Sequence, residues 1–181
     1  ITSGDGNTAL GYQAGSAITT QTSNTLIGKG AGDALTSNNN TIIGHNALGA
    51  ASSSSDGNTV VGRSAMKDST AATYNTSIGM SALEDTTGDY NIGIGSNAGD
   101  NITSGSGNII IGTVDAGSAT GSRQLKIAGY DGSTTTTWIS GDSSGNLTFP
   151  ADVAAASLDI SGNVDIDGTL EADAITLDGS A

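Results

Sequence analysis

The sequence predicts an all-β fold: a parallel β-roll, or β-solenoid, of about seven coils of about 17 residues each, followed by a thin β-shaft. Two observations predict it. One short motif recurs seven times at nearly constant spacing, and the composition favours strands and turns. Three segments are expected: a β-roll over 1–117, a β connector with short hairpins over 118–150, and a fibrous shaft of short β triplets over 151–181.

The composition argues against an ordinary globular enzyme. Gly (28), Ser (24), Thr (24) and Asn (14) make up about half of the 181 residues, and only 3% are aromatic. A compact domain of this length normally fills its centre with large side chains, which this chain lacks. Disorder is not expected either, because β-branched residues are plentiful and regularly placed.

The charge balance and the absence of cysteine narrow the partners and the compartment. A net charge of −13 argues against binding to nucleic acid and to anionic membranes. No apolar run is long enough for membrane insertion, and no signal-peptide pattern opens the chain. The lack of cysteine excludes disulfides and thiolate metal sites, and it fits an extracellular or virion protein.

The repeat is an Asn followed four residues later by Gly, in the pattern Asn-Thr-x-aliphatic-Gly-x-x-Ala. Its segment 1–7 recurs almost unchanged as 102–108, so the sequence is expected to open within a repeat. The Asn column comprises Asn7, Asn24, Asn40, Asn58, Asn75, Asn91 and Asn108. Stacked amides of this kind can form a hydrogen-bonded ladder, while the alternative is that Asn simply tolerates an unusual turn dihedral.

Within each repeat, the residues from Asn to Gly are expected to form a short strand that Gly ends, at a sharp turn or a close backbone contact. The aliphatic residue three after Asn is expected to point into the coil. This predicted core column comprises Leu10, Ile27, Ile43, Val61, Ile78, Ile94 and Ile111. The small Ala seven after Asn is expected at an inside corner of the coil.

The residue before each aliphatic position would then face outward. None of these residues is charged, and the larger ones suggest burial against another copy of the chain. The predicted trimer-face column comprises Ala9, Leu26, Ile42, Val60 and Ile110, interrupted by Ser77 and Gly93. The alternative is burial on both sides within one chain, with the polar connector folded over this stripe.

Downstream, the motif gives way to two different patterns. Segments 123–128, 135–139 and 146–149 are expected to be strands, with turns at 129–132 and 141–145. Short alternating triplets follow at 158–160, 164–166, 170–172 and 175–177. Pieces this short cannot close a core within one chain, which suits a shaft built by several chains.

The motif resembles the repeats of bacteriophage tail-fibre and tail-spike proteins and, more distantly, the head repeats of trimeric autotransporter adhesins. The resemblance covers residues 1 to about 117 and is looser over 123–177. It implies parallel coils and a parallel homotrimer of three rolls. In the tail-fibre group it also implies a C-terminal self-cleaving chaperone, which is not visible before Ala181.

Candidate chemistry is sparse, so neither catalysis nor a metal or other cofactor is expected. His45 is the only histidine, and its column also holds Tyr12, Lys29 and Arg63, as a solvent-facing column would. The Asp-Gly turns follow neither the EF-hand loop nor the calcium nonapeptide repeat. Glycoside hydrolysis would need paired carboxylates in a cleft usually lined by aromatics, whereas Trp138 is interpreted as packing at a junction.

The expected function is therefore structural and adhesive: a segment of a phage tail fibre in the virion. It would project a surface toward a host receptor, such as a glycan, and contact other tail or surface proteins. A bacterial trimeric adhesin on the cell surface is the alternative. Ice binding by a Thr-rich face is a more distant third, because each coil has one Thr beside an aliphatic residue that is expected to be buried.

Overall fold

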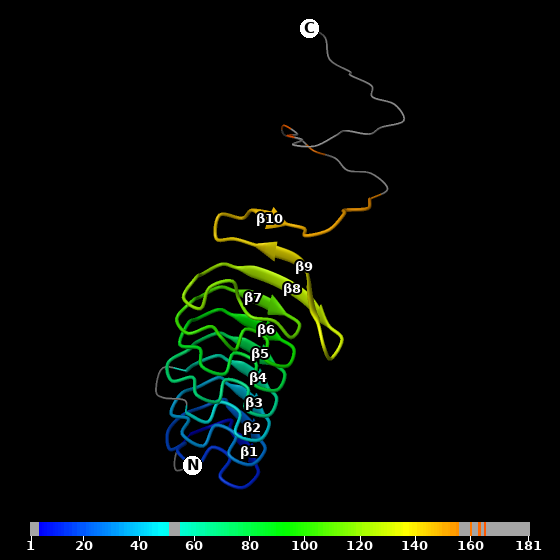
Figure 1. The fold of residues 1–181 in the computed structure, drawn as a ribbon. Helices are drawn as coiled ribbons and strands as arrows, with labels where there is room; N and C mark the ends of the chain where they lie inside the picture. The colour runs from blue at the N-terminus through cyan, green and yellow to red at the C-terminus, as the bar shows by residue number, and fades with distance from the viewer. Residues whose placement is uncertain (1–3, 51–54, 156–159, 161–162, 164, 166–181) are drawn as a thin grey trace. The chain divides into compact units, whose positions relative to one another are not determined.

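The computed structural model describes residues 4–50, 55–155, 160, 163 and 165, and every regular element in them is a β-strand (Figure 1). No helix in this part of the chain could span a membrane. The chain divides into two compact units, Ile1–Ala151 and Asp152–Ala181, and the first contains all ten strands. Most of the predicted triplet shaft lies outside the described residues.

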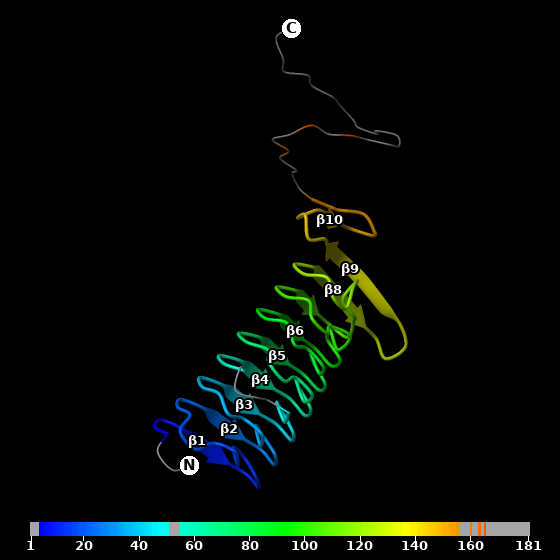
Figure 2. The same cartoon turned by 90° about the vertical axis from the view of Figure 1, so that its left-hand side faces the viewer.

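Seven three-residue strands repeat along the first unit, one in each coil. They are β1 (Thr8–Leu10), β2 (Thr25–Ile27), β3 (Thr41–Ile43), β4 (Thr59–Val61), β5 (Thr76–Ile78), β6 (Ile92–Ile94) and β7 (Ile109–Ile111). Each strand pairs in parallel with the next, and residues at the same position of the motif lie opposite each other, as Thr25 does to Thr41. The predicted parallel β-solenoid of about seven turns is thus confirmed (Figure 2).

A glycine ends each of these strands because two backbones meet there. Gly28 has φ +131°, and a Cβ added to it would lie 2.5 Å from the carbonyl oxygen of Gly44 in the next coil. Gly44 meets Gly62 in the same way, at 2.2 Å. Any larger residue would clash with a carbonyl and would strain the backbone, so glycine is required at this corner.

The interior of the solenoid is lined by the middle residue of each strand, which contradicts the predicted facing. The predicted trimer-face residues Leu26, Ile42, Val60 and Ile110 are fully buried in the core, together with Ser77. Gly93 is also buried, and Ala9, in the first coil, is exposed. Side chains alternate along a strand, and in these three-residue strands the middle one points inward while the two that flank it point outward.

The predicted core column points outward instead. Leu10 is 67% exposed, and Ile43, Ile78 and Ile94 are each exposed by more than a third. Ile27, Val61 and Ile111 are half-buried. The prediction was wrong because two alternating columns are both apolar, and strict aliphatic character was taken as the mark of the interior.

Residues beyond the strand complete the core. The Ala seven after Asn is buried in five coils, as its predicted inside corner requires: Ala31, Ala47, Ala65, Ala82 and Ala98. Ala14 is half-buried against the same cluster.

A large side chain then comes from one of two positions, eight or eleven residues after Asn. In the first, second and sixth coils, Gly occupies the position eight residues after Asn, and the large side chain comes from the position eleven residues after Asn: Ile18, Leu35 or Ile102. In the fifth coil the order is reversed, because Leu83 occupies the former position and the smaller Thr86 the latter.

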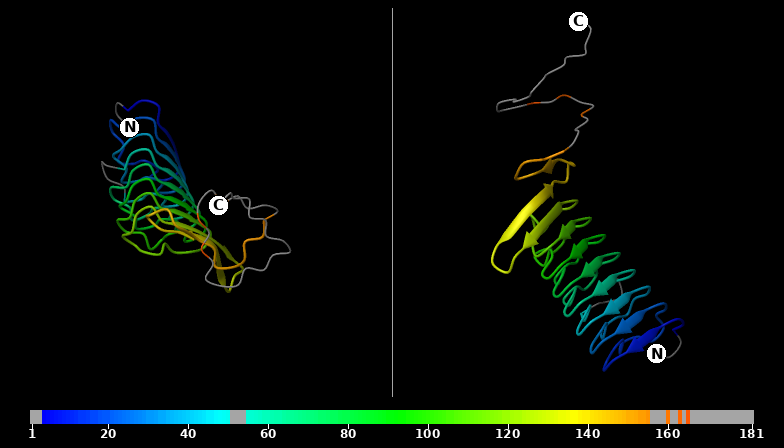
Figure 3. Two further views of the ribbon diagram at one scale, coloured as in Figure 1. Left: turned by 90° about the horizontal axis from the view of Figure 1, so that it is seen from above. Right: turned by 90° about the vertical axis from the view of Figure 1, so that its right-hand side faces the viewer.

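Two longer strands extend the sheet after the seventh coil. Strand β8 (Leu125–Tyr130) pairs in parallel with β7, and β9 (Thr135–Gly141) then pairs with β8 in the antiparallel direction. Strand β10 (Leu147–Thr148) pairs antiparallel with β9. The β8–β9 turn reaches beyond the side of the coil stack (Figure 3). Strand β8 includes Gly129 and Tyr130, which the sequence placed in the turn.

Candidate binding surfaces

The Asn column forms a buried ladder inside the solenoid. Asn58 is 1% exposed, and its Nδ2 donates to Asn40 Oδ1 (3.1 Å), to Ser55 O (2.8 Å) and to Ala72 O (2.9 Å). Its Oδ1 accepts hydrogen bonds from the backbone N–H (2.9 Å) and the Nδ2 (3.2 Å) of Asn75. These contacts confirm the predicted ladder.

The ladder runs along the whole stack. Asn7 Oδ1 accepts from the backbone N–H of Asn24 at 3.0 Å, and Asn91 Oδ1 accepts in the same way from Asn108 at 2.9 Å. Gln124 takes the Asn position at the next level, where its N–H and Nε2 donate to Asn108 Oδ1. These amides satisfy one another and the backbone, so the column is structural and leaves little capacity for a ligand.

The outward face of the sheet runs along the whole coil stack. It carries two parallel columns, which we call the sheet face. The first column comprises Thr8, Thr25, Thr41, Thr59, Thr76, Ile92, Ile109 and Leu125, and the second comprises the seven misassigned aliphatic residues and Ile127. Charged side chains are absent from both columns.

A column that carries two cations, which we call the cationic column, borders the sheet face at the strand ends. Lys29, His45 and Arg63 occupy equivalent positions in consecutive coils, and backbone hydrogen bonds join their levels (Asn46 N–H to Lys29 O, 2.9 Å; Ser64 N–H to His45 O, 3.0 Å). All three side chains are exposed, as the sequence predicted for the column of His45. Asp56 and Asp89 lie at the opposite ends of the strands and are half-buried. Each accepts a hydrogen bond from a backbone N–H of the preceding coil, Asp56 from Asn38 and Asp89 from Thr73.

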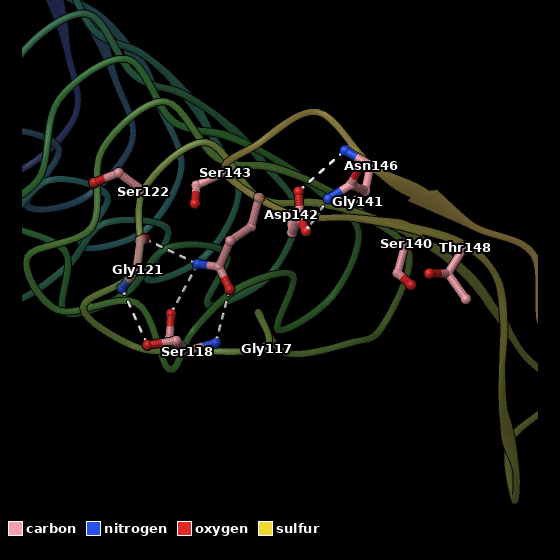
Figure 4. Close-up of a pocket in the computed structure, with 11 residues that line it drawn as sticks. Gly117, Ser118, Gly121, Ser122, Ser140, Gly141, Asp142, Ser143, Asn146 and Thr148 are labelled. Carbon is pink, nitrogen blue, oxygen red and sulfur yellow. Dashed lines mark hydrogen bonds between the residues drawn. The ribbon is translucent and has the colours of Figure 1, made fainter. Parts of the chain in front are cut away.

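A polar pocket of about 400 Å³ lies where the loop after β7 faces the β9–β10 turn (Figure 4). Serine and threonine hydroxyls dominate its lining. Its stronger polar groups hold the walls together: Gln124 Nε2 donates to Gly121 O (2.9 Å), and Asp142 Oδ2 accepts from Asn146 Nδ2 (2.8 Å). Hydrogen bonds from Asn146 lower the pKa of Asp142, so its carboxylate is a turn anchor.

Two aspartates lie beside a lysine at the end of the coil stack. Asp115 and Asp100 share a pocket with Lys126, and burial, followed by a hydrogen bond and repulsion from Asp100, raises the pKa of Asp115. Within the described residues, no three His, Cys, Asp or Glu side chains lie close enough together to hold a metal ion.

The sequence located the Asn ladder, the glycine corners and the exposed column of His45, but it placed the sheet face inside. The Thr column beside the aliphatic column was a partial signal for the outward side, because Thr tolerates exposure better than Ile or Leu. It did not decide the facing, since Ile92 and Ile109 take the Thr position in the last two coils. Comparison of the chain with protein-family models, with curated protein sequences and with solved structures gave no match.

Proposed function

We propose that this protein is a structural fibre segment: a stiff β-solenoid that associates side by side with further copies of itself, in parallel, to form a homotrimer. The observation that carries the proposal is the sheet face. Its aliphatic column runs along seven coils, with Ile43, Ile78 and Ile94 each exposed by more than a third. An uninterrupted apolar surface of this kind marks a protein–protein contact.

The distribution of side chains along the sheet face favours a protein partner. In the last coils, Ile92, Ile109 and Leu125 replace Thr in the first column, so both columns become aliphatic there. Burial of such a patch stabilises an interface by about 25 cal/mol per Å² of apolar surface before the costs of association.

Charges at the two edges favour a cyclic parallel arrangement. Each contact in a threefold assembly joins one edge of a protomer to the opposite edge of its neighbour. The cationic column (Lys29, His45, Arg63) would then approach the edge that carries Asp56 and Asp89. In a chain of net charge −13, this pairing reduces repulsion between copies.

The biological role that fits such a rod is mechanical and recognitional: a virion tail-fibre segment that holds a receptor-contacting surface away from its anchor. The supports are the solenoid fold and the motif that resembles tail-fibre repeats. Electron micrographs of labelled particles test this role, because labelled fibres on virions support it and labelled fibres on bacterial cells would favour an adhesin.

Two matched variants test the assembly. Sedimentation of the wild-type chain should show three times the 17.6 kDa of one copy, and Ile43→Asp should produce folded monomers, since its side chain lies on the sheet face. Ile42→Asp should unfold the solenoid, because an unpaired charge would enter the core at a position that is 0% exposed. Ala34→Ser, at an exposed connector position outside the sheet face and its two charged edges, is the control and should leave the trimer intact. A folded wild-type monomer would contradict the proposal.

Ice binding is a second candidate, favoured by one observation. Thr and the aliphatic residue share the exposed face, so the regular outward array of hydroxyls and methyl groups is present. Thermal hysteresis of the purified chain tests it, and Thr59→Leu should abolish the effect if ice is the ligand. We favour the fibre because the last two coils lose their threonines.

A further inference from the structure

We propose that the β8–β9 hairpin carries a binding site for a neutral pyranose sugar, centred on Trp138. This proposal deepens the recognition role of the proposed fibre by naming the ligand class. The site is a pocket of about 350 Å³ in the first unit, at the lower end of the range for small-molecule sites. Its lining residues are Gly129, Tyr130, Asp131, Thr134, Thr136 and Trp138.

A β-bulge directs Trp138 out of the regular ladder. Ile127 pairs with Ile139, but the next residue of β8, Ala128, pairs with Thr137, so Trp138 is the extra residue of β9. Bulges of this kind turn a side chain away from the alternation of the strand. The hairpin turn extends past the coils in Figures 1 and 2, while Thr135 at the base of β9 donates a hydrogen bond to the carbonyl of Thr113 (3.4 Å).

The indole of Trp138 lies against a glycine, and most of it is open. A Cβ on Gly129 would come within 2.5 Å of Trp138 Cζ2 and 2.7 Å of Cη2, so only glycine allows the ring to lie there. Trp138 is nevertheless 55% exposed, and Tyr130, beside it, is 51% exposed. The sequence interpretation of Trp138 as junction packing therefore accounts for only part of its surface.

Polar groups suited to sugar hydroxyls surround this aromatic surface. Asp131 Oδ1 accepts hydrogen bonds from the backbone N–H of Ser133 (2.9 Å) and of Thr134 (2.8 Å), which hold the carboxylate in place. Its Oδ2 atom is thereby available to accept from a ligand hydroxyl. The hydroxyls of Thr134 and Thr136 add donors and acceptors on the same rim.

A pyranose matches this combination because it has an apolar C–H face and a rim of hydroxyls. The C–H face stacks on the indole of Trp138, while the hydroxyls pair with Asp131 and the threonines. An extended apolar peptide would use the aromatics but leave the carboxylate desolvated and unpaired, at a cost that disfavours it. The site has no basic side chain for an anionic group.

Trp138 itself provides the test, because it is the only tryptophan of the chain. We would titrate the purified protein with methyl α-mannopyranoside, methyl β-galactopyranoside and N-acetylglucosamine while recording tryptophan emission. The expected result is a saturable change with at least one sugar. Asp131→Asn keeps the Oδ1 acceptor for the turn and should weaken binding about tenfold. Gly129→Val should abolish it by displacing the indole.

Tyr12→Ala is the matched control, since Tyr12 is 70% exposed and lies in the first coil, far from the hairpin along the stack. It should bind as the wild type does. The proposal is overturned if no sugar gives a saturable change, or if Tyr12→Ala and Gly129→Val alter the signal equally. It is also overturned if acrylamide fails to quench Trp138 in the assembled protein. Sedimentation of Asp131→Asn shows whether this variant still assembles, so that a loss of sugar binding can be told apart from a loss of the assembly.

Discussion

At the scale of single residues, the fold depends on polar side chains more than on large apolar ones. Each buried asparagine replaces hydrogen bonds that water would otherwise supply to the coil, and within the described part of the chain no buried side-chain nitrogen or oxygen lacks a partner. Asn58 alone takes part in five such bonds. A chain with few aromatic side chains is stabilised by this satisfaction of its backbone.

Replacing Asn58 by alanine should therefore destabilise the solenoid by at least about 3 kcal/mol, because several buried partners lose their hydrogen bonds together. The carbonyl of Ala72 and the N–H of Asn75 would be left unpaired, and the carbonyl of Ser55 would keep only its hydrogen bond from Ser37 Oγ. Chemical denaturation measures the change. Asn39→Gly is the control: Asn39 is exposed with φ 61°, a conformation that glycine adopts freely, so this variant should be nearly neutral.

A second residue-scale prediction concerns pH. The pKa of Asp115 is raised above 3.8, so the folded state binds this proton more tightly than the unfolded state does. The protonated carboxyl of Asp115 contributes most to stability below pH 3.8, and this contribution is lost as the pH rises through the folded-state pKa. At pH 7 the charged carboxylate therefore disfavours folding, and a neutral amide would not. Asp115→Asn should raise the melting temperature at pH 7. Equal melting curves for the two proteins at pH 7 would show that Asp115 has no such effect.

At the scale of the element, each coil is a small packing unit whose side-chain volume is shared between positions. Where Leu83 fills the interior, the strand residue of the following coil shrinks to Gly93, and a Cβ there would lie 2.7 Å from Leu83 Cγ. Where Gly99 occupies the position equivalent to Leu83, Ile102 fills the space from farther along the coil, with Cδ1 3.0 Å from a Cβ built on Gly99. The interior volume is thus balanced between neighbouring coils.

This balance predicts a strong coupling between two positions. Gly93→Val alone should cost about 1–3 kcal/mol by overpacking against Leu83, and Leu83→Ala alone about 2–5 kcal/mol by leaving a cavity. The double variant should be clearly more stable than the sum of the two effects implies, because valine fills the space that leucine leaves. Urea denaturation of all four proteins measures the coupling, and strict additivity would contradict the packing described here.

At the scale of the whole molecule, the outward sheet face and the net charge of −13 oppose each other. The apolar columns favour association, whereas like charges on every copy repel one another over about 10 Å at moderate ionic strength. The cationic column at the edge offsets part of this repulsion. The proposed assembly should therefore respond to salt.

Raising the ionic strength from low values should strengthen self-association, because screening reduces the net repulsion while the apolar contact is retained. Sedimentation equilibrium at several salt concentrations measures the dissociation constant. Substitution of Lys29 and Arg63 by Gln should weaken association most at low salt. Association that falls steadily with added salt would instead indicate an interface dominated by ion pairs.

Much of the fold could be predicted because it is periodic and local. The spacing of Asn and Gly located the β1–β7 strands, their parallel register and the glycine corners, since each depends on the backbone and on identical neighbours one coil away. The buried amide ladder followed from the same repetition. The hairpin site was not predicted, because the bulge that exposes Trp138 arises from the register between β8 and β9.

The sequence by itself determined the solenoid, its period and the residues at its corners. Only the tertiary structure decided which side of each strand faces inward. Ile42 and Ile43 are both isoleucine and adjacent, yet one is 0% and the other 37% exposed. Composition cannot separate two such columns; the direction in which the chain turns after each glycine does, because it places the alanines and Leu48, Met66 or Leu83 behind the middle residue of the strand.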